Sequence, residues 1–194
     1  MNTYSAFKYI AFKLNAEHVH DLTLNLLSVA PQISELFSPL KLDKRMRLKS
    51  GELEWKFPVG LAAGFDKNAS CISFFEKMGF GAIEVGTITK VKQTGNPKPR
   101  IFRLIKEESV RNAMGFPNAG ADNIYNNIKK KPSYDICIGS NLGKNKDTST
   151  ENTPLEYAYL YEKFAPISDY LVINISSPNT PGLRSFQKKD LLLP

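Results

Sequence analysis

Four short apolar segments of the chain each end in small or amide-bearing residues, and helical spacing follows each of the first three. The four endings are Ala63-Gly64, Gly86-Thr87, Ser140-Asn141 and Asn174. Alternation of strands and helices favours a parallel sheet with helices on its face. Ligands bind at the carboxyl ends of the strands in such folds. The repeat therefore predicts one site to which all four endings contribute.

The last ending continues into the loop Asn174-Ile175-Ser176-Ser177-Pro178-Asn179-Thr180-Pro181-Gly182-Leu183-Arg184. Its prolines fix φ and remove N–H donors, while its glycine permits positive φ, so we expect a rigid polar loop. By composition alone the loop is equally compatible with a surface turn. The three earlier endings of the same kind favour a binding site.

The order of these segments favours a (β/α)8 barrel of the TIM type. A doubly wound sheet is the competing fold, but the chain lacks the Gly-x-Gly-x-x-Gly motif with a downstream acid that would support it. We expect a hairpin at 45–55, an extended segment at 100–104, and strands at 59–64, 82–87, 134–139 and 169–174. We expect helices at 69–78, 121–130 and 153–164, and a further helix beginning at 185. Thr153 is expected to cap the helix at 153–164.

A barrel typically takes about 250 residues, and this chain has 194. We therefore expect only the first half of a barrel, about four β/α units, in residues 41–194. A half barrel exposes two sheet edges and an apolar interior. Such a chain is expected to be unstable alone, or to be a fragment of a longer product.

Residues 1–40 form a separate N-terminal segment with the spacing of two amphipathic helices, near 4–14 and 16–31. They could cap the main domain or lie in a membrane interface. His18 and His20 are two apart on one helix and do not face the same way, so no metal site is expected. His20 is suited either to packing or to lining a tunnel.

The net charge is +7 and the pI is about 9.3, which favours anionic partners. Lysines are scattered and no arginine stripe with interleaved aromatics occurs, so we expect a solvated face and no nucleic-acid partner. Cys71 and Cys137 form no Cys-x-x-Cys motif, which fits buried thiols in a reducing compartment. No signal or transit peptide and no 18-residue apolar run is evident.

Five motifs together carry a resemblance to a known family. They are Ala62-Ala63-Gly64-Phe65-Asp66-Lys67, Met78-Gly79-Phe80-Gly81 with Glu84-Val85-Gly86-Thr87, Asn112-Ala113-Met114-Gly115-Phe116, Asn141-Leu142-Gly143-Lys144-Asn145, and the loop 174–184. In this order and spacing the chain resembles dihydroorotate dehydrogenase, and more narrowly the membrane-associated, quinone-dependent class 2 enzymes. The N-terminal helical pair and Ser177, where class 1 enzymes carry cysteine, mark class 2.

The resemblance implies FMN-dependent oxidation of dihydroorotate to orotate with a quinone as acceptor, in de novo pyrimidine (UMP) synthesis. Ser177 would be the catalytic base that takes the C5 proton. The implied substrate-binding residues are Lys67, Asn112, Ala113, Met114, Gly115, Phe116, Asn174 and Asn179. The implied cofactor-binding residues are Ala63, Gly64, Phe65, Asp66, Lys67, Thr87, Asn141 and Asn174. His20 and Arg103 match quinone-facing positions; from the residues alone, Arg103 could be a surface charge or an anchor toward the N-terminal helices.

A serine is a poor base at its free pKa, so the site must stabilise its deprotonation or relay the proton. No histidine lies near Ser177 in sequence, which argues against a serine hydrolase. Two positions depart from the family motif: Ala113 replaces arginine, and Pro117 replaces asparagine. The absent half of the barrel would carry the FMN phosphate site.

The resemblance further implies a bacterial-type monomer held peripherally at the cytoplasmic face of the inner membrane by its N-terminal helices. Two other hypotheses stay open at this point. One is a truncated, inactive fragment of the enzyme. The other is a basic membrane-surface module, which leaves the segments 112–116 and 174–184 unexplained.

Overall fold

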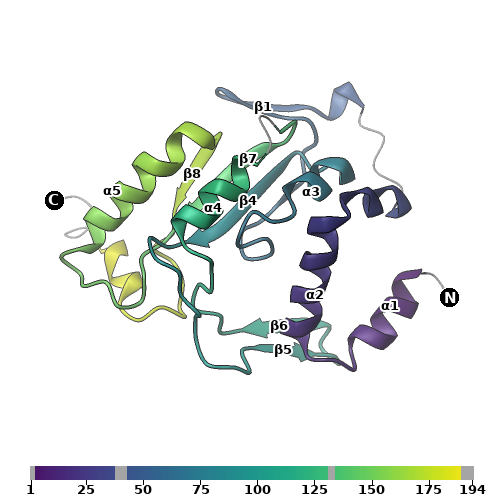
Figure 1. Cartoon of the computed structure of the whole chain (residues 1–194), viewed down its shortest axis with the longest axis horizontal. Coiled ribbons are helices and arrows are strands. Elements are labelled where there is room, and N and C mark those ends of the chain that lie inside the picture. Colours follow the sequence, from purple (N-terminus) through teal and green to yellow (C-terminus); the bar gives the residue numbers. More distant parts are fainter. Residues whose placement is uncertain (1–2, 38–42, 131–133, 189–194) are drawn as a thin grey trace.

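The computed structural model describes residues 3–37, 43–130 and 134–188, which form an α/β fold (Figure 1). Its central sheet has four parallel strands in the order β3-β4-β7-β8 within the described residues. They are β3 (Gly60–Leu61), β4 (Ala82–Ile88), β7 (Cys137–Leu142) and β8 (Tyr170–Ile173). The connections run through α3 (Ile72–Met78), α4 (Ala121–Ile128) and α5 (Thr153–Phe164), as parallel pairing requires. The predicted alternation of strands and helices is confirmed.

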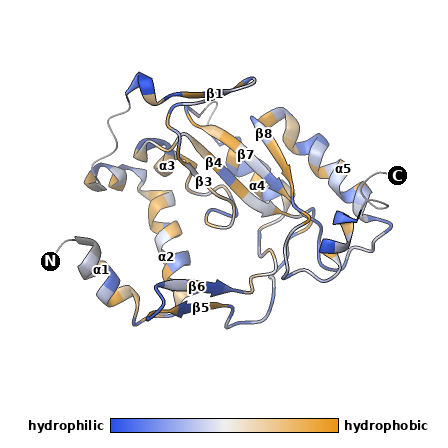
Figure 2. Cartoon of the chain, turned by 180° about the vertical axis from the view of Figure 1, so that it is seen from behind, coloured by the Kyte–Doolittle hydropathy of each residue, from blue (hydrophilic) through white to orange (hydrophobic). Residues whose placement is uncertain are grey.

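The two inner strands form the core of the sheet, and the two outer strands do not. Ile83 and Val85 of β4 are fully buried, whereas Ile173 of β8 is 49% exposed. The apolar sequences at 59–64 and 169–174 favour fully buried strands, and that expectation is wrong for both, because β3 and β8 are only partly buried. Both are edge strands in this sheet, so each has a neighbour on one side only. The apolar character of β8 is visible in Figure 2.

Helices α4 and α5 lie side by side across one face of the sheet (Figures 1 and 2). The rings of Tyr125 and Phe164 meet edge to face between them, with centroids 6.2 Å apart. Helix α5 has the predicted bounds, but Thr153 is its first residue and Asn152 is its cap. The Thr153 hydroxyl donates instead to the Ser149 carbonyl at 2.8 Å. The predicted cap was wrong because this bond uses the hydroxyl.

Two of the predicted boundaries that shift have identifiable causes in the hydrogen bonding. Strand β7 continues three residues beyond the predicted end, because Ser140 and Asn141 keep the parallel register with β8. Helix α3 begins three residues late, because the Asp66 carboxylate accepts hydrogen bonds from the backbone N–H groups of Ser70 and Cys71 and closes a turn there.

The predicted N-terminal helical pair is present as α1 (Thr3–Ala11) and α2 (Ala16–Val29), followed by the 3-10 helix η1 (Pro31–Phe37). The side chain of Asn15 caps α2 by accepting from the N–H groups of Glu17 and His18. Within the described ranges, no helix has the length and apolar character needed to cross a membrane.

Two antiparallel hairpins complete the fold. The predicted one pairs β1 (Leu48–Ser50) with β2 (Leu53–Trp55). The second pairs the predicted extended segment, β5 (Ile101–Leu104), with β6 (Ser109–Asn112), which the sequence did not indicate. This hairpin lies beside α2 (Figure 1). The remaining 3-10 turns are η2 (Lys44–Met46), η3 (Ala165–Ile167) and η4 (Leu183–Gln187). The helix expected from 185 is seen only as η4, and residues 189–194 lie outside the described ranges.

Candidate active site

A cavity of about 920 Å³ opens where the four parallel strands end. It collects residues from the strand ends, from α2, from the β5–β6 hairpin and from the loop after β8. The lining includes every predicted site residue except two: His20, Ala63, Gly64, Phe65, Lys67, Thr87, Arg103, Asn112, Met114, Gly115, Phe116, Asn141, Asn174, Ser177 and Asn179. The loop 174–184 is therefore part of a cavity wall, which decides against the surface-turn alternative.

Three polar side chains at adjacent strand ends bond to one another. Thr87 Oγ1 donates to Asn141 Oδ1 at 2.6 Å. Asn174 Nδ2 donates to Thr87 Oγ1 at 3.0 Å and to Asn141 Oδ1 at 3.1 Å. The parallel register of β4, β7 and β8 places these residues together. Because each amide is fixed by its neighbours, the wall presents donors and acceptors in set directions.

The adjoining wall is backbone with little side chain. Gly64 has φ +101°, and a Cβ added there would meet nothing within 4 Å, so its face is open. Gly86 has φ +113°, and a Cβ there would lie 2.6 Å from the Asn141 carbonyl oxygen. The Gly64 N–H donates to the Gly86 carbonyl at 2.9 Å, which joins the two strand ends. A flat ligand can approach the backbone closely at such a wall.

Lys67 supplies a cation to the cavity and lies against His20. Its Nζ is 3.2 Å from His20 Nε2. Burial lowers the pKa of Lys67, and burial followed by the charge of Lys67 lowers the pKa of His20. Both shifts disfavour the charged forms of the two groups, and the His20 ring packs edge-on against Phe65 with centroids 5.0 Å apart. Lys67 is therefore a cavity residue and not a surface lysine.

The Ser177 hydroxyl faces the cavity with its oxygen held by the chain itself. The Asn179 backbone N–H donates to Ser177 Oγ at 3.2 Å. This donor favours negative charge developing on the oxygen. The neighbouring Ser176 is not a lining residue, and its hydroxyl bonds to Asn174 Oδ1 at 3.1 Å. The two serines of this loop thus have different surroundings.

Two predicted site residues, Asp66 and Ala113, do not reach the cavity wall. Asp66 is fully buried, burial raises its pKa, and its carboxylate holds the turn before α3. Ala113 is held through its backbone, since its N–H donates to the Arg100 carbonyl at 2.8 Å. Arg103 is both on the wall and an anchor, because its guanidinium donates to the Leu14 carbonyl at 2.8 Å.

Among the lining residues that had no role assigned from the sequence, Glu84 is the charged one. Glu84 accepts from Asn141 Nδ2 at 2.7 Å and so orients that amide. The signal for it was an acid within the otherwise apolar strand β4.

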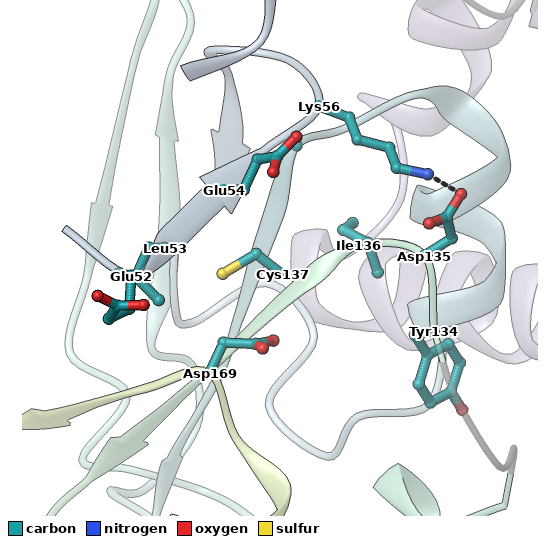
Figure 3. A pocket seen from close by; sticks show the side chains of 10 residues that line it. Glu52, Leu53, Glu54, Lys56, Tyr134, Asp135, Ile136, Cys137 and Asp169 are labelled. Carbon is teal, nitrogen blue, oxygen red and sulfur yellow. Dashed lines mark ion pairs between the residues drawn. The ribbon is translucent and has the colours of Figure 1, made fainter. Parts of the chain in front are cut away.

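A second cavity, of about 320 Å³, lies at the opposite end of the sheet (Figure 3). Its polar side chains largely satisfy one another or the backbone: Lys56 pairs with Asp135, and Asp169 Oδ2 accepts from the Ile138 N–H at 2.7 Å. Burial raises the pKa of Cys137 to about 11, so its thiol is not activated. Across the described residues, no group of three or more His, Cys, Asp or Glu side chains could hold a metal ion.

Comparisons with known proteins find relatives of this chain in both sequence and fold. The family model for dihydroorotate dehydrogenase matches residues 46–193. A dihydroorotate dehydrogenase (quinone) of Aliivibrio fischeri strain MJ11 is 48% identical over 188 residues, covering 93% of this chain and 54% of the relative. A dihydroorotate dehydrogenase (quinone) of Idiomarina loihiensis is 45% identical over 186 residues, covering 95% of this chain and 55% of the relative. The chain thus spans about half the length of the curated relatives it matches.

The crystal structure of DHODH in complex with ferulenol from Eimeria tenella has a TM-score of 0.78 and 40% identity, covering 91% of this chain and 48% of that one. The chain therefore belongs to the dihydroorotate dehydrogenase family.

Proposed function

We propose that this chain forms the N-terminal half of a (β/α)8 barrel that oxidises dihydroorotate to orotate with FMN and passes the electrons to a quinone, in pyrimidine synthesis. One observation carries the proposal. A single cavity collects the Lys67 ammonium, the Ser177 hydroxyl and the amides of Asn112, Asn174 and Asn179 from segments far apart in the sequence.

These groups suit a small, flat, anionic substrate. Lys67 offers a charge for the carboxylate in a partly desolvated place. The amides of Asn112 and Asn179 offer paired donors and acceptors that match the ring amides. Ser177 Oγ is the atom that accepts the ring proton, and the Asn179 N–H stabilises that oxygen as it gains charge.

The cavity also fits an isoalloxazine ring. Gly64 leaves the backbone wall open to a planar group, and the fixed amides of Asn141 and Asn174 with the Thr87 hydroxyl suit a heterocycle edge. FMN, when bound, supplies the hydride acceptor. We assign Ala63, Gly64, Phe65, Thr87, Asn141 and Asn174 to holding it.

We further propose that residues 1–40 contact the membrane and admit the quinone past His20 and Arg103. Several large apolar side chains of α1 and α2 are exposed, among them Phe7, Ile10, Leu22, Leu26 and Val29. Relatives of this chain carry quinone in their names. Exposed apolar side chains on paired helices fit burial in the headgroup boundary.

Vesicle flotation checks this contact. We expect the chain to float with phosphatidylglycerol–phosphatidylcholine vesicles. The double variant Leu22→Gln, Leu26→Gln should bind at least about a hundredfold more weakly, since burying each leucine is worth roughly 1.5–3 kcal/mol and about 1.4 kcal/mol is tenfold. Leu155→Gln on α5 is the matched control, because Leu155 is 70% exposed and Leu22 is 68% exposed. Equal flotation of all three proteins would remove the membrane proposal.

A chimera tests the enzymatic proposal. In it, this chain replaces the corresponding N-terminal half of the Aliivibrio fischeri relative. We expect the purified chimera to retain FMN and to reduce a soluble quinone analogue when given dihydroorotate. A chimera that is folded and yellow yet shows no dihydroorotate-dependent reduction would refute the proposal and favour an inactive fragment. The 194-residue chain alone, measured in parallel, shows whether the half barrel has any turnover.

A further inference from the structure

One side chain, Asn96, bridges the two loops that carry the proposed substrate ligands. Its Nδ2 donates to the Ala113 carbonyl at 3.1 Å and to the Asn179 carbonyl at 3.2 Å. Its backbone N–H donates to the Met114 carbonyl at 2.9 Å. Asn96 does not line the cavity, so it acts on these loops and not on a ligand.

Asn96 is itself held by a buried ion pair with α2. Arg100 Nη1 donates to the Asn96 carbonyl at 2.8 Å. The same guanidinium binds the Glu17 carboxylate, with Nη2 to Oε1 at 2.6 Å and Nε to Oε1 and Oε2 at 3.1 and 3.2 Å. Both side chains are buried. Glu17 lies three residues before His20 on α2, so one helix contacts both the cavity and this bridge.

Asn96 and Arg100 are closely packed against the backbone of neighbouring glycines. A Cβ added at Gly115 would lie 2.7 Å from Asn96 Cγ, and one at Gly95 would lie 2.7 Å from Arg100 Nη1. Because glycine is what allows these close approaches, a movement of Asn96 must move the loop 112–116 with it.

We propose that Asn96 is a positioning residue that sets the separation of the loop 112–116 from the loop 177–179, and that the Glu17–Arg100 pair couples this separation to the seating of α2. The inference rests on the proposed function, because the substrate would lie between these loops. The cost of a misplacement of about 1 Å between a substrate and its catalytic group can reach 10²-fold.

The isosteric variant Asn96→Asp tests the proposal, since it keeps the volume but replaces both donors with acceptors facing two carbonyl oxygens. In the chimera we expect kcat/KM for dihydroorotate to fall by about ten- to hundredfold, with FMN content and the KM for the quinone analogue unchanged. A merely structural role would change all three. The control is Asn126→Asp on α4, an exposed asparagine given the same charge change.

Hydrogen exchange in the purified chimera gives a readout that does not depend on turnover. Asn96→Asp should raise exchange at the backbone amides of Ser177, Asn179 and Thr180 several-fold, and Asn126→Asp should not. If the chimera is inactive, the proposed function fails, but the exchange result still shows whether Asn96 holds the two loops together. If the chimera is active and Asn96→Asp matches Asn126→Asp in kcat/KM, the inference is overturned although the function stands.

Discussion

Replacing Ser177 by alanine is expected to lower dihydroorotate oxidation by the chimera about 10²- to 10⁴-fold, the range for loss of a general base. FMN content should not change, because the residues assigned to FMN are held by bonds that do not involve Ser177. Stopped-flow measurement of flavin bleaching by dihydroorotate isolates the affected half-reaction. Oxidation of the pre-reduced enzyme by the quinone analogue should keep its wild-type rate.

Ser176→Ala is the matched control for this variant, because Ser176 is the adjacent serine and does not itself line the cavity. We expect it to retain activity within a few-fold. Ser177→Cys should recover part of the lost rate, and that rate should rise as pH approaches about 8.5, the ordinary thiol pKa. Bleaching at the wild-type rate in Ser177→Ala would exclude Ser177 as the base.

Truncating Glu17 to alanine is expected to lower the free energy of unfolding of the chain by about 3–5 kcal/mol. The reason is the buried guanidinium of Arg100, which would lose its countercharge while staying desolvated. Domains are typically stable by only about 5–15 kcal/mol, so this is a large fraction. Urea denaturation followed by circular dichroism gives the difference directly.

Glu54→Ala is the control, because Glu54 pairs with Arg47 at 2.8 Å on the surface with about half of each side chain exposed. An exposed pair contributes about 0–1 kcal/mol. The hydrogen bonds from Arg100, followed by those from Lys98, hold the pKa of Glu17 below its usual value despite its burial. The stabilisation is therefore present above the unfolded-state pKa and is lost as pH falls through the lowered one. Equal losses in the two variants, or no acid-dependent difference, would contradict this account.

Local patterns predicted most of the elements correctly. Helical spacing located α2, α4 and α5, and apolar runs ending in small or amide residues located β4, β7 and β8. Such signals depend on residues close together in the sequence, so they can be recognised without the tertiary structure. The same signals could not give the burial of β3 and β8. Burial depends on which strand lies alongside, and in this sheet both strands are edges.

The candidate site divides in the same way. By itself the sequence determined the family motifs and the residue types that could bind an anion and a flat heterocycle, because these lie in contiguous stretches. Only the tertiary structure decided that Lys67 lies against His20 and that Asn96 joins the loop 112–116 to the loop 177–179. These contacts depend on strand register and helix packing, and no local periodicity encodes them.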